Sequence, residues 1–262
     1  MVDVRLRTTI ALLTMVSLLG CASLPKQSSE FDQASKEMTK LAVMPPKFDL
    51  QKVGTFSGDL VSEMNHDIEM VVKEAADTVI EASSLSAAVL DVSDESLVAH
   101  PELRSAIFEQ QAPVEKVHKD LVGTGKSIDI KYEGNADPFA DVADCDYLTF
   151  IEGNGFFKTG GAQVKDAVLA GLFGGSAGPE TTTFLSAFIV DVSREKVIWY
   201  NEVNRQNSDP RKPSHLLDTV KKLLAPLVGQ SAVKWDHSRD EQLIQKYKQR
   251  MHDAEASSGT TK

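Results

Sequence analysis

The fold of this chain is decided by residues 181–192, which read TTTFLSAFIVDV. Large apolar residues occupy both alternating sets of positions in this run, with Phe188 and Val190 on one side and Leu185 and Ile189 on the other. A strand of this kind is expected to be buried on both sides. Residues 193–200 read SREKVIWY, a turn followed by a second apolar strand, so the sequence predicts a β-hairpin.

Further strands are expected on either side of this hairpin. Residues 41–44 read LAVM and are stopped by Pro45 and Pro46, which cannot donate to a strand ladder. Residues 127–132 alternate in the manner of a strand, and residues 146–152 are expected to form another, with an extension through Phe156 and Phe157. Residues 85–92 form another candidate strand, although their alanines leave a helical alternative open.

Amphipathic helices are expected between the strands. A long helix should follow Ser57, which can cap it, because apolar residues recur every three or four positions from Leu60 to Val79. Further helices are expected at 102–122, interrupted by Pro113, at 137–143, at 216–228 and, with few apolar positions, at 241–252. The tail from residue 254 to residue 262 is small and polar, and it is expected to be disordered.

The start of the chain has the three parts of a secretory signal. Arg5 and Arg7 precede residues 10–19, IALLTMVSLL, and the small residue Gly20 precedes Cys21. The apolar run is about half the ~20 residues that a membrane-spanning helix needs. An ordinary cleaved signal with an incidental cysteine, or a buried N-terminal helix, are the alternatives to a lipid-attachment signal.

Residues 18–21, LLGC, resemble the bacterial lipobox. The resemblance implies cleavage before Cys21, a diacylglycerol thioether on its thiol and acylation of its new amino group, and such chains hold a domain to a membrane. Leu19 differs from the smaller or β-branched residue that the lipobox usually has there. The resemblance also brings in the enterobacterial sorting rule, by which lipoproteins with Asp directly after the cysteine stay in the inner membrane. Ala22 at this position therefore favours the periplasmic face of the outer membrane.

The acidic composition argues against nucleic acid and anionic lipid as partners. The net charge is −10, and Arg5, Arg7 and Asp3 sum to +1, so the chain from Cys21 carries −11. Such an acidic chain has no basic patch for nucleic acid and no charge attraction to anionic lipid. The sequence has two cysteines. If Cys21 is acylated, Cys145 has no partner for a disulfide within the chain, and we interpret it as a packing residue.

Several motifs resemble functional sites but lack residues or spacings that those sites need. Residues 123–127, GTGKS, imitate a phosphate loop, but Asp120 stands where the motif needs glycine. The aspartates of residues 137–146 could bind calcium but do not have the spacing of a calcium loop. The six histidines are scattered, and no two of them stand three or four residues apart, so no zinc-binding helix is expected. We therefore expect no cofactor, no metal and no enzymatic activity.

Residues 163–178 are unusual because they are rich in glycine and carry no charge between Asp166 and Glu180. The favoured interpretation is a crossover helix packed on the sheet with a loose glycine return. The alternative is a segment that contacts a membrane or a neighbouring subunit.

The order of elements and the hairpin, with its VDVSREKVIW sequence at residues 190–199, resemble the periplasmic lipoproteins of the CsgG, LpoB and TolB-N-terminal type. This chain has Glu195 and Lys196 where those motifs usually have glycine. The resemblance implies a two-layer α/β sandwich, in which helices pack against a mixed sheet, plus a C-terminal helix. It also implies a non-catalytic role in the cell envelope.

The predicted organisation is a signal peptide at 1–20, a flexible tether at 21–40, an α/β domain at 41–230, and a charged helix with a disordered tail at 231–262. The expected function is that of an outer-membrane lipoprotein, anchored through Cys21, that acts as a structural or interaction module with an envelope protein partner. The alternative is an oligomeric export or secretion accessory in which the glycine-rich insert contacts the membrane.

Overall fold

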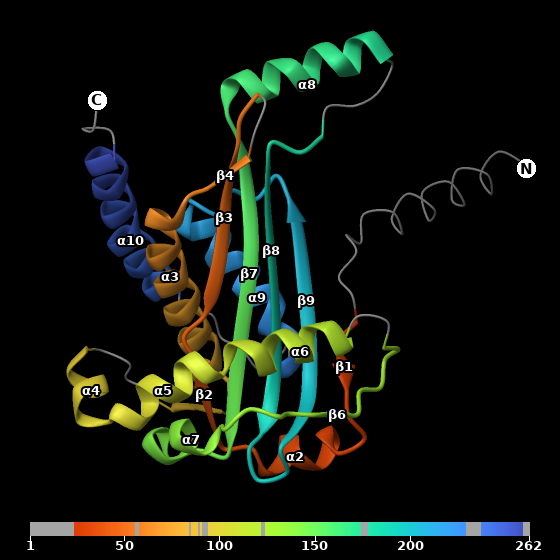
Figure 1. Ribbon diagram of the computed structural model, residues 1–262, viewed down its shortest axis with the longest axis vertical. Helices are drawn as coiled ribbons and strands as arrows, with labels where there is room; N and C mark the ends of the chain where they lie inside the picture. Colours follow the sequence, from red (N-terminus) through yellow and green to blue (C-terminus); the bar gives the residue numbers. More distant parts are fainter. Residues whose placement is uncertain are drawn as a thin grey trace, which may run out of the picture.

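The computed structural model describes residues 24–55, 58–83, 85–88, 90, 94–121, 124–173, 178–228 and 237–258. Within these residues the chain forms one mixed sheet of nine strands with helices packed against it (Figure 1). The predicted class, a mixed α/β fold with a C-terminal helix, is confirmed.

The sheet is built around the predicted hairpin. β8 (Thr181–Asp191) pairs antiparallel with β9 (Lys196–Gln206) on one side and with β7 (Tyr147–Lys158) on the other. β7 then pairs in parallel with β2 (Lys40–Val43) along its first half and with β3 (Lys47–Val53) along its second half. Pro45 and Pro46 separate β2 from β3, as expected for residues that break a ladder.

Short strands complete the edges of the sheet. β5 (Ser86–Ala88) extends it in parallel beyond β2, and β4 (Gly58–Leu60) pairs with β3. β1 (Lys26–Gln27) and β6 (Ile130–Lys131) both pair antiparallel with β9. The predicted strand at 127–132 is therefore only two residues long.

Helices cover both faces of the sheet. On one face lie α3 (Ser62–Glu81) and α9 (Pro213–Val228), which share a core with Leu185, Ala187 and Ile189 of β8, and α10 (His237–Ser258) packs against these two helices. On the other face, α5 (Pro101–Glu109), α6 (Gln111–Leu121) and α7 (Asp137–Ala143) surround Phe188 and Val190. α4 (Asp94–Ala99) precedes α5. The expectation that β8 is buried on both sides is confirmed, and the second helical layer is additional to the two layers expected.

Some helix boundaries differ from those predicted. α3 begins at Ser62 rather than after Ser57, because β4 occupies the residues between them; residues 56 and 57 lie outside the described part of the chain. The helix expected at 102–122 is two helices that meet at Gln110. Pro113 lies in the first turn of α6, where its missing N–H has no intrahelical partner to lose.

The segment expected as a flexible tether is folded over most of its length. Residues 24–40 contain β1 and the helix α2 (Phe31–Glu37), and Phe31 and Ala34 are buried in the same core as α3 and α9. At the other end of the chain α10 reaches Ser258 and buries Leu243 and Tyr247, so part of the expected tail is helical.

Candidate functional site

The lipidation candidate Cys21 and the expected signal peptide lie outside the described residues, so the site is built from the first described residue, Leu24. β1 joins the sheet two residues later, where Lys26 pairs with Tyr200 and Gln27 with Trp199. The backbone N–H of Gln27 also donates to the carbonyl oxygen of Lys126 at 3.0 Å. The body of the protein therefore begins five residues after Cys21.

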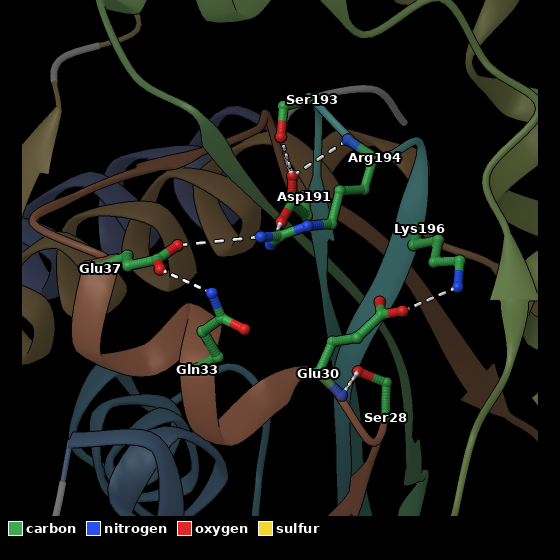
Figure 2. Close-up of polar contacts among 8 residues, drawn as sticks. All are labelled: Ser28, Glu30, Gln33, Glu37, Asp191, Ser193, Arg194 and Lys196. Atoms are coloured by element: carbon green, nitrogen blue, oxygen red, sulfur yellow. Dashed lines mark hydrogen bonds and ion pairs between the residues drawn. The ribbon is translucent and has the colours of Figure 1, made fainter.

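Polar contacts fix the N-terminal segment to the turn between β8 and β9 (Figure 2). Glu30 and Lys196 form an ion pair of 3.0 Å, and Arg194 lies 3.8 Å from Glu37 of α2. Arg194 also pairs with the buried Asp191 at 2.5 Å, which orients its guanidinium group towards α2. These contacts are partly exposed, so the burial of Phe31 contributes more to the attachment than the ion pairs do.

The helix α8 (Gly160–Phe173) occupies the insert at residues 163–178; residues 174–177 lie outside the described part of the chain. Figure 1 shows it beyond the end of the sheet, away from the helices that cover the two faces. Four large apolar side chains of α8 are 42 to 72% exposed: Val164, Val168, Leu169 and Leu172. The expectation of a crossover helix packed on the sheet is wrong, since β7 and β8 are antiparallel neighbours and their connection does not have to cross the sheet.

Polar contacts at its N-terminal end hold α8 to the sheet. The Lys158 ammonium lies 2.5 Å from the carboxylate of Asp166, and Lys165 donates to the carbonyl oxygen of Thr55 at 3.0 Å. Ala162 is buried against the sheet. The first turn and a half of α8 is therefore attached to the strand ends, and the exposed apolar side chains lie mainly beyond it.

A second cluster of charged groups lies beside Lys158, after β9. Arg211 pairs with Asp209 at 2.8 Å and stacks over the ring of Phe157, with 3.9 Å between the guanidinium carbon and the ring centroid. Burial alone would raise the pKa of Asp209, but hydrogen bonds from the Arg211 side chain and backbone N–H outweigh it and lower that pKa. Asp209 is thus a paired carboxylate at neutral pH.

A polar pocket of about 340 Å³ lies on the α6 face of the sheet. The Nε2 atom of His118, on α6, lies 2.9 Å from the carboxylate of Glu152 on β7. The Tyr200 hydroxyl donates to Glu202 at 2.5 Å, and burial raises the pKa of Tyr200, so this phenol stays protonated. Sequence reasoning missed the His118–Glu152 pair, since the two residues are 34 positions apart and share no motif.

Two hydroxyl groups that line this pocket form hydrogen bonds within it, those of Ser186 and Tyr200. The one serine in the lining, Ser186, donates its hydroxyl to the backbone carbonyl of Glu152 at 3.4 Å, so His118 does not hold it as a nucleophile. The ring of His118 packs edge-on against Phe188, with centroids 5.4 Å apart. Ser186 and Tyr200 are therefore bonded to groups within the pocket, while the partly exposed His118 and Glu152 side chains face each other across it.

The aspartates of residues 137–146 lie at the opposite end of the sheet from α8. Asp137, Asp141, Asp144 and Asp146 are all exposed, and Asp144 pairs with Lys40. No group of three or more His, Cys, Asp or Glu side chains within the described residues is placed to hold a metal ion. Burial raises the pKa of the neighbouring Cys145 thiol, and its sulfur donates to the carbonyl of Tyr147. It is a buried packing residue.

The loop at 123–127 follows α6 and leads towards β6, with residues 122 and 123 outside the described part of the chain. Ser127 forms a bridge with Gln27 of β1. The loop therefore pairs with the N-terminal segment, and it does not connect a strand to a helix as a phosphate loop does.

None of the described helices has both the length and the apolar character needed to cross a membrane.

No protein-family model and no curated protein matches the sequence. Among solved structures, the fold is similar to the PelC dodecamer from Paraburkholderia phytofirmans, with a TM-score of 0.33, 14% identity, and coverage of 73% of this chain and 88% of that chain. It is also similar to the LpoB C-terminal domain from Salmonella enterica, with a TM-score of 0.22, 10% identity, and coverage of 69% and 96%. These are distant resemblances of fold.

Proposed function

We propose that this protein is an envelope lipoprotein, anchored through Cys21, that acts through contacts with other envelope proteins and not as an enzyme. The single observation that carries the proposal is the N-terminal sequence, in which a basic start and a short apolar run lead directly to LLGC at residues 18–21. Several acyl chains on one cysteine provide the membrane affinity that an acidic chain lacks by charge alone.

The folded N-terminal segment supports an interaction role. Because β1 and α2 are part of the core, the lipid at Cys21 would be joined to the folded body through only the four residues 22–25. A body held in this way stays within a short distance of the membrane surface. Such an arrangement suits a scaffold or a regulator that must bind its partner close to the membrane.

Labelling with palmitate in bacterial cells tests the anchor. The wild-type chain is expected to incorporate palmitate and to fractionate with membranes, and Cys21→Ser is expected to lose the label. Membrane fractionation that is unchanged in Cys21→Ser, or an unmodified amino terminus in the native protein, would contradict the proposal.

The proposed position in the outer membrane has its own test. In density-gradient separation of the two membranes, the wild-type protein is expected in the outer membrane fraction. The variant Ala22→Asp is expected to move to the inner membrane fraction, and Ala22→Ser serves as the matched control that keeps a small uncharged residue. Equal distribution of all three proteins would argue against the outer membrane.

A second candidate function is an oligomeric export or secretion accessory. The exposed apolar side chains of α8 favour it, because such a surface is typical of a contact with lipid or with a neighbouring subunit. Light scattering of the acylated protein in detergent and of the Cys21→Ser protein in buffer tests this candidate. A body that stays monomeric in both at high concentration would exclude it.

A further inference from the structure

The connection to Cys21 and the exposed helix α8 belong to the same end of the sheet. Gln206, the last residue of β9, pairs with Thr182, and Phe157 near the end of β7 pairs with Thr181. The end of β7, the start of β8 and the end of β9 therefore form one edge of the molecule, and α8 connects two of these strands across it (Figure 1).

The direction of β1 sends the chain towards this edge. β1 runs antiparallel to β9, so going from Lys26 towards Leu24 the chain moves in the direction in which β9 advances from Tyr200 to Gln206. Pro25 restricts Leu24 to extended conformations, which keeps that direction. The six residue steps from Tyr200 to Gln206 cover about 20 Å, and the five steps from Lys26 to Cys21 cover at most about 18 Å. A fully extended chain would therefore bring Cys21 close to the level of Gln206, at the edge of the sheet beyond which α8 lies.

The four large exposed apolar side chains of α8 lie on one side of the helix. Val164, Val168, Leu169 and Leu172 fall within less than half of the helix circumference at 100° per residue. Lys165 lies on the same arc near the sheet, where it is bonded to Thr55. A helix with such a stripe can lie with its apolar side about 5–10 Å inside the headgroup boundary.

Charge distinguishes the two ends of the sheet. Near α8 the charged groups are paired, Lys158 with Asp166 and Arg211 with Asp209. The opposite end exposes Asp137, Asp141 and Asp146, and also Asp144 and Glu195, which pair with Lys40 and Lys131. An anionic bilayer would repel that acidic end and would meet little net charge beside α8.

From these observations we infer that α8 lies in the headgroup region of the bilayer that holds the Cys21 lipid, so that the body stands on the membrane with the α8 end of its sheet downwards. The occupant of the exposed α8 stripe is the lipid surface itself. This inference rests on the proposed anchor at Cys21 and adds a second, non-covalent point of attachment that sets the orientation of the body.

Fluorescence quenching by lipid tests the inference on the acylated protein, purified from bacterial membranes and reconstituted into vesicles of phosphatidylethanolamine and phosphatidylglycerol. An environment-sensitive fluorophore is placed by Leu172→Cys on α8 or by Phe108→Cys on α5. These two positions are matched, because both side chains are apolar and 72% and 75% exposed. The unsubstituted protein, treated in parallel, reports any labelling of Cys145.

Lipids brominated near the headgroup are expected to quench the probe at position 172 several-fold more strongly than the probe at position 108. Equal quenching at the two positions would overturn the inference. Shielding at position 172 that increases with protein concentration but is insensitive to brominated lipid would identify a second copy as the occupant, and this also would overturn it.

Charge substitutions give an independent readout in the same vesicles. Val168→Glu is expected to reduce quenching at position 172 to the level at position 108, and the matched surface change Val98→Glu is expected to leave it unchanged. Unaltered quenching in Val168→Glu would count against the inference. Circular dichroism of both variants checks that the fold is retained.

Mass spectrometry of the N-terminal peptide from the same preparation separates failure of the anchor from failure of the inference. An unmodified Cys21 together with strong quenching at position 172 would refute the proposed anchor and leave the α8 contact standing. An acylated Cys21 without quenching at position 172 would refute the α8 contact alone.

Discussion

Glu195 has a backbone φ of 50° at the turn between β8 and β9, in the left-handed region that favours glycine. Its carbonyl oxygen accepts a hydrogen bond from the N–H of Tyr132 at 2.8 Å. The turn therefore cannot adopt a less strained backbone conformation without losing this hydrogen bond. The hairpin motif that this sequence resembles usually has glycine near this position. The structure therefore gives a physical reason for that preference.

Glu195→Gly is expected to increase the free energy of unfolding by about 1 kcal/mol relative to Glu195→Ala, because only glycine removes the cost of the left-handed backbone. Both variants lose the exposed ion pair with Lys131, so that loss cancels in the comparison. Urea unfolding followed by circular dichroism measures the difference. Equal stability of the two variants would contradict the assignment of strain to this residue.

Glu69 on α3 satisfies a backbone group of the sheet. It accepts a hydrogen bond from the N–H of Phe48 at 3.0 Å, and its neighbour Asn65 accepts one from Leu50 at 3.1 Å. Burial raises the pKa of Glu69, and the Phe48 hydrogen bond only partly opposes the shift. The folded state therefore binds a proton at this carboxyl more readily than the unfolded state does.

The sign of the pH effect follows from this raised pKa. As the pH falls from 7 to about 4, wild-type protein is expected to gain stability relative to Glu69→Gln, since protonation removes the cost of a buried charge. Glutamine keeps an acceptor for Phe48, so the comparison isolates the charge. Urea unfolding at several pH values, with the exposed Glu115→Gln as control, measures it. A pH-independent difference between wild type and Glu69→Gln would show the prediction to be incorrect.

At the scale of elements, β1 and α2 depend on the rest of the fold. β1 has only two residues, and α2 has seven, which are too few to be stable alone. Both are held by the pairing of β1 with β9 and by the burial of Phe31 and Ala34. An ordered N-terminal segment of this length is a product of tertiary contacts.

Phe31→Ala is expected to release this segment, with a local loss of about 2–4 kcal/mol, because a nearly fully buried ring is removed. Glu37→Gln, which removes the charge that faces Arg194 but keeps an acceptor for the Gln33 amide, is expected to cost less than about 1 kcal/mol. Hydrogen exchange of residues 24–40 measures both. Unchanged protection in Phe31→Ala would mean that the ring does not hold the segment.

At the scale of the whole molecule, the buried thiol of Cys145 reports on global unfolding. The sequence has two cysteines, so Cys145 is the one free thiol of a chain acylated at Cys21. Its burial raises the thiol pKa, and burial and protonation both suppress the reactive thiolate.

The native acylated protein is expected to react slowly with a thiol-specific chromogenic reagent, and the rate should rise with urea in parallel with loss of circular dichroism. One thiol should titrate in the unfolded protein and none in Cys145→Ala. Two titrating thiols would show that Cys21 is unmodified, and fast reaction in the native state would show that Cys145 is accessible.

Local patterns in the sequence were enough to predict the main elements. Apolar runs and apolar stripes predicted the hairpin at 181–200, the strand at 146–157 and the helices at 137–143 and 216–228. These patterns depend on residues that are only a few positions apart in the sequence. The mixed α/β class follows from the same patterns. The strand β3 was missed, because residues 47–53 alternate weakly and pair with β7, which lies about a hundred residues away.

Tertiary structure decided which surfaces are covered. The apolar residues of α8 have the composition of a packed helix, and only the placement of this helix beyond the sheet leaves them exposed. In the same way, the polar residues 24–40 resemble a tether in sequence and fold because β9 offers a free edge. Amphipathicity is a local property of a segment, whereas its burial depends on neighbours that are distant in the sequence.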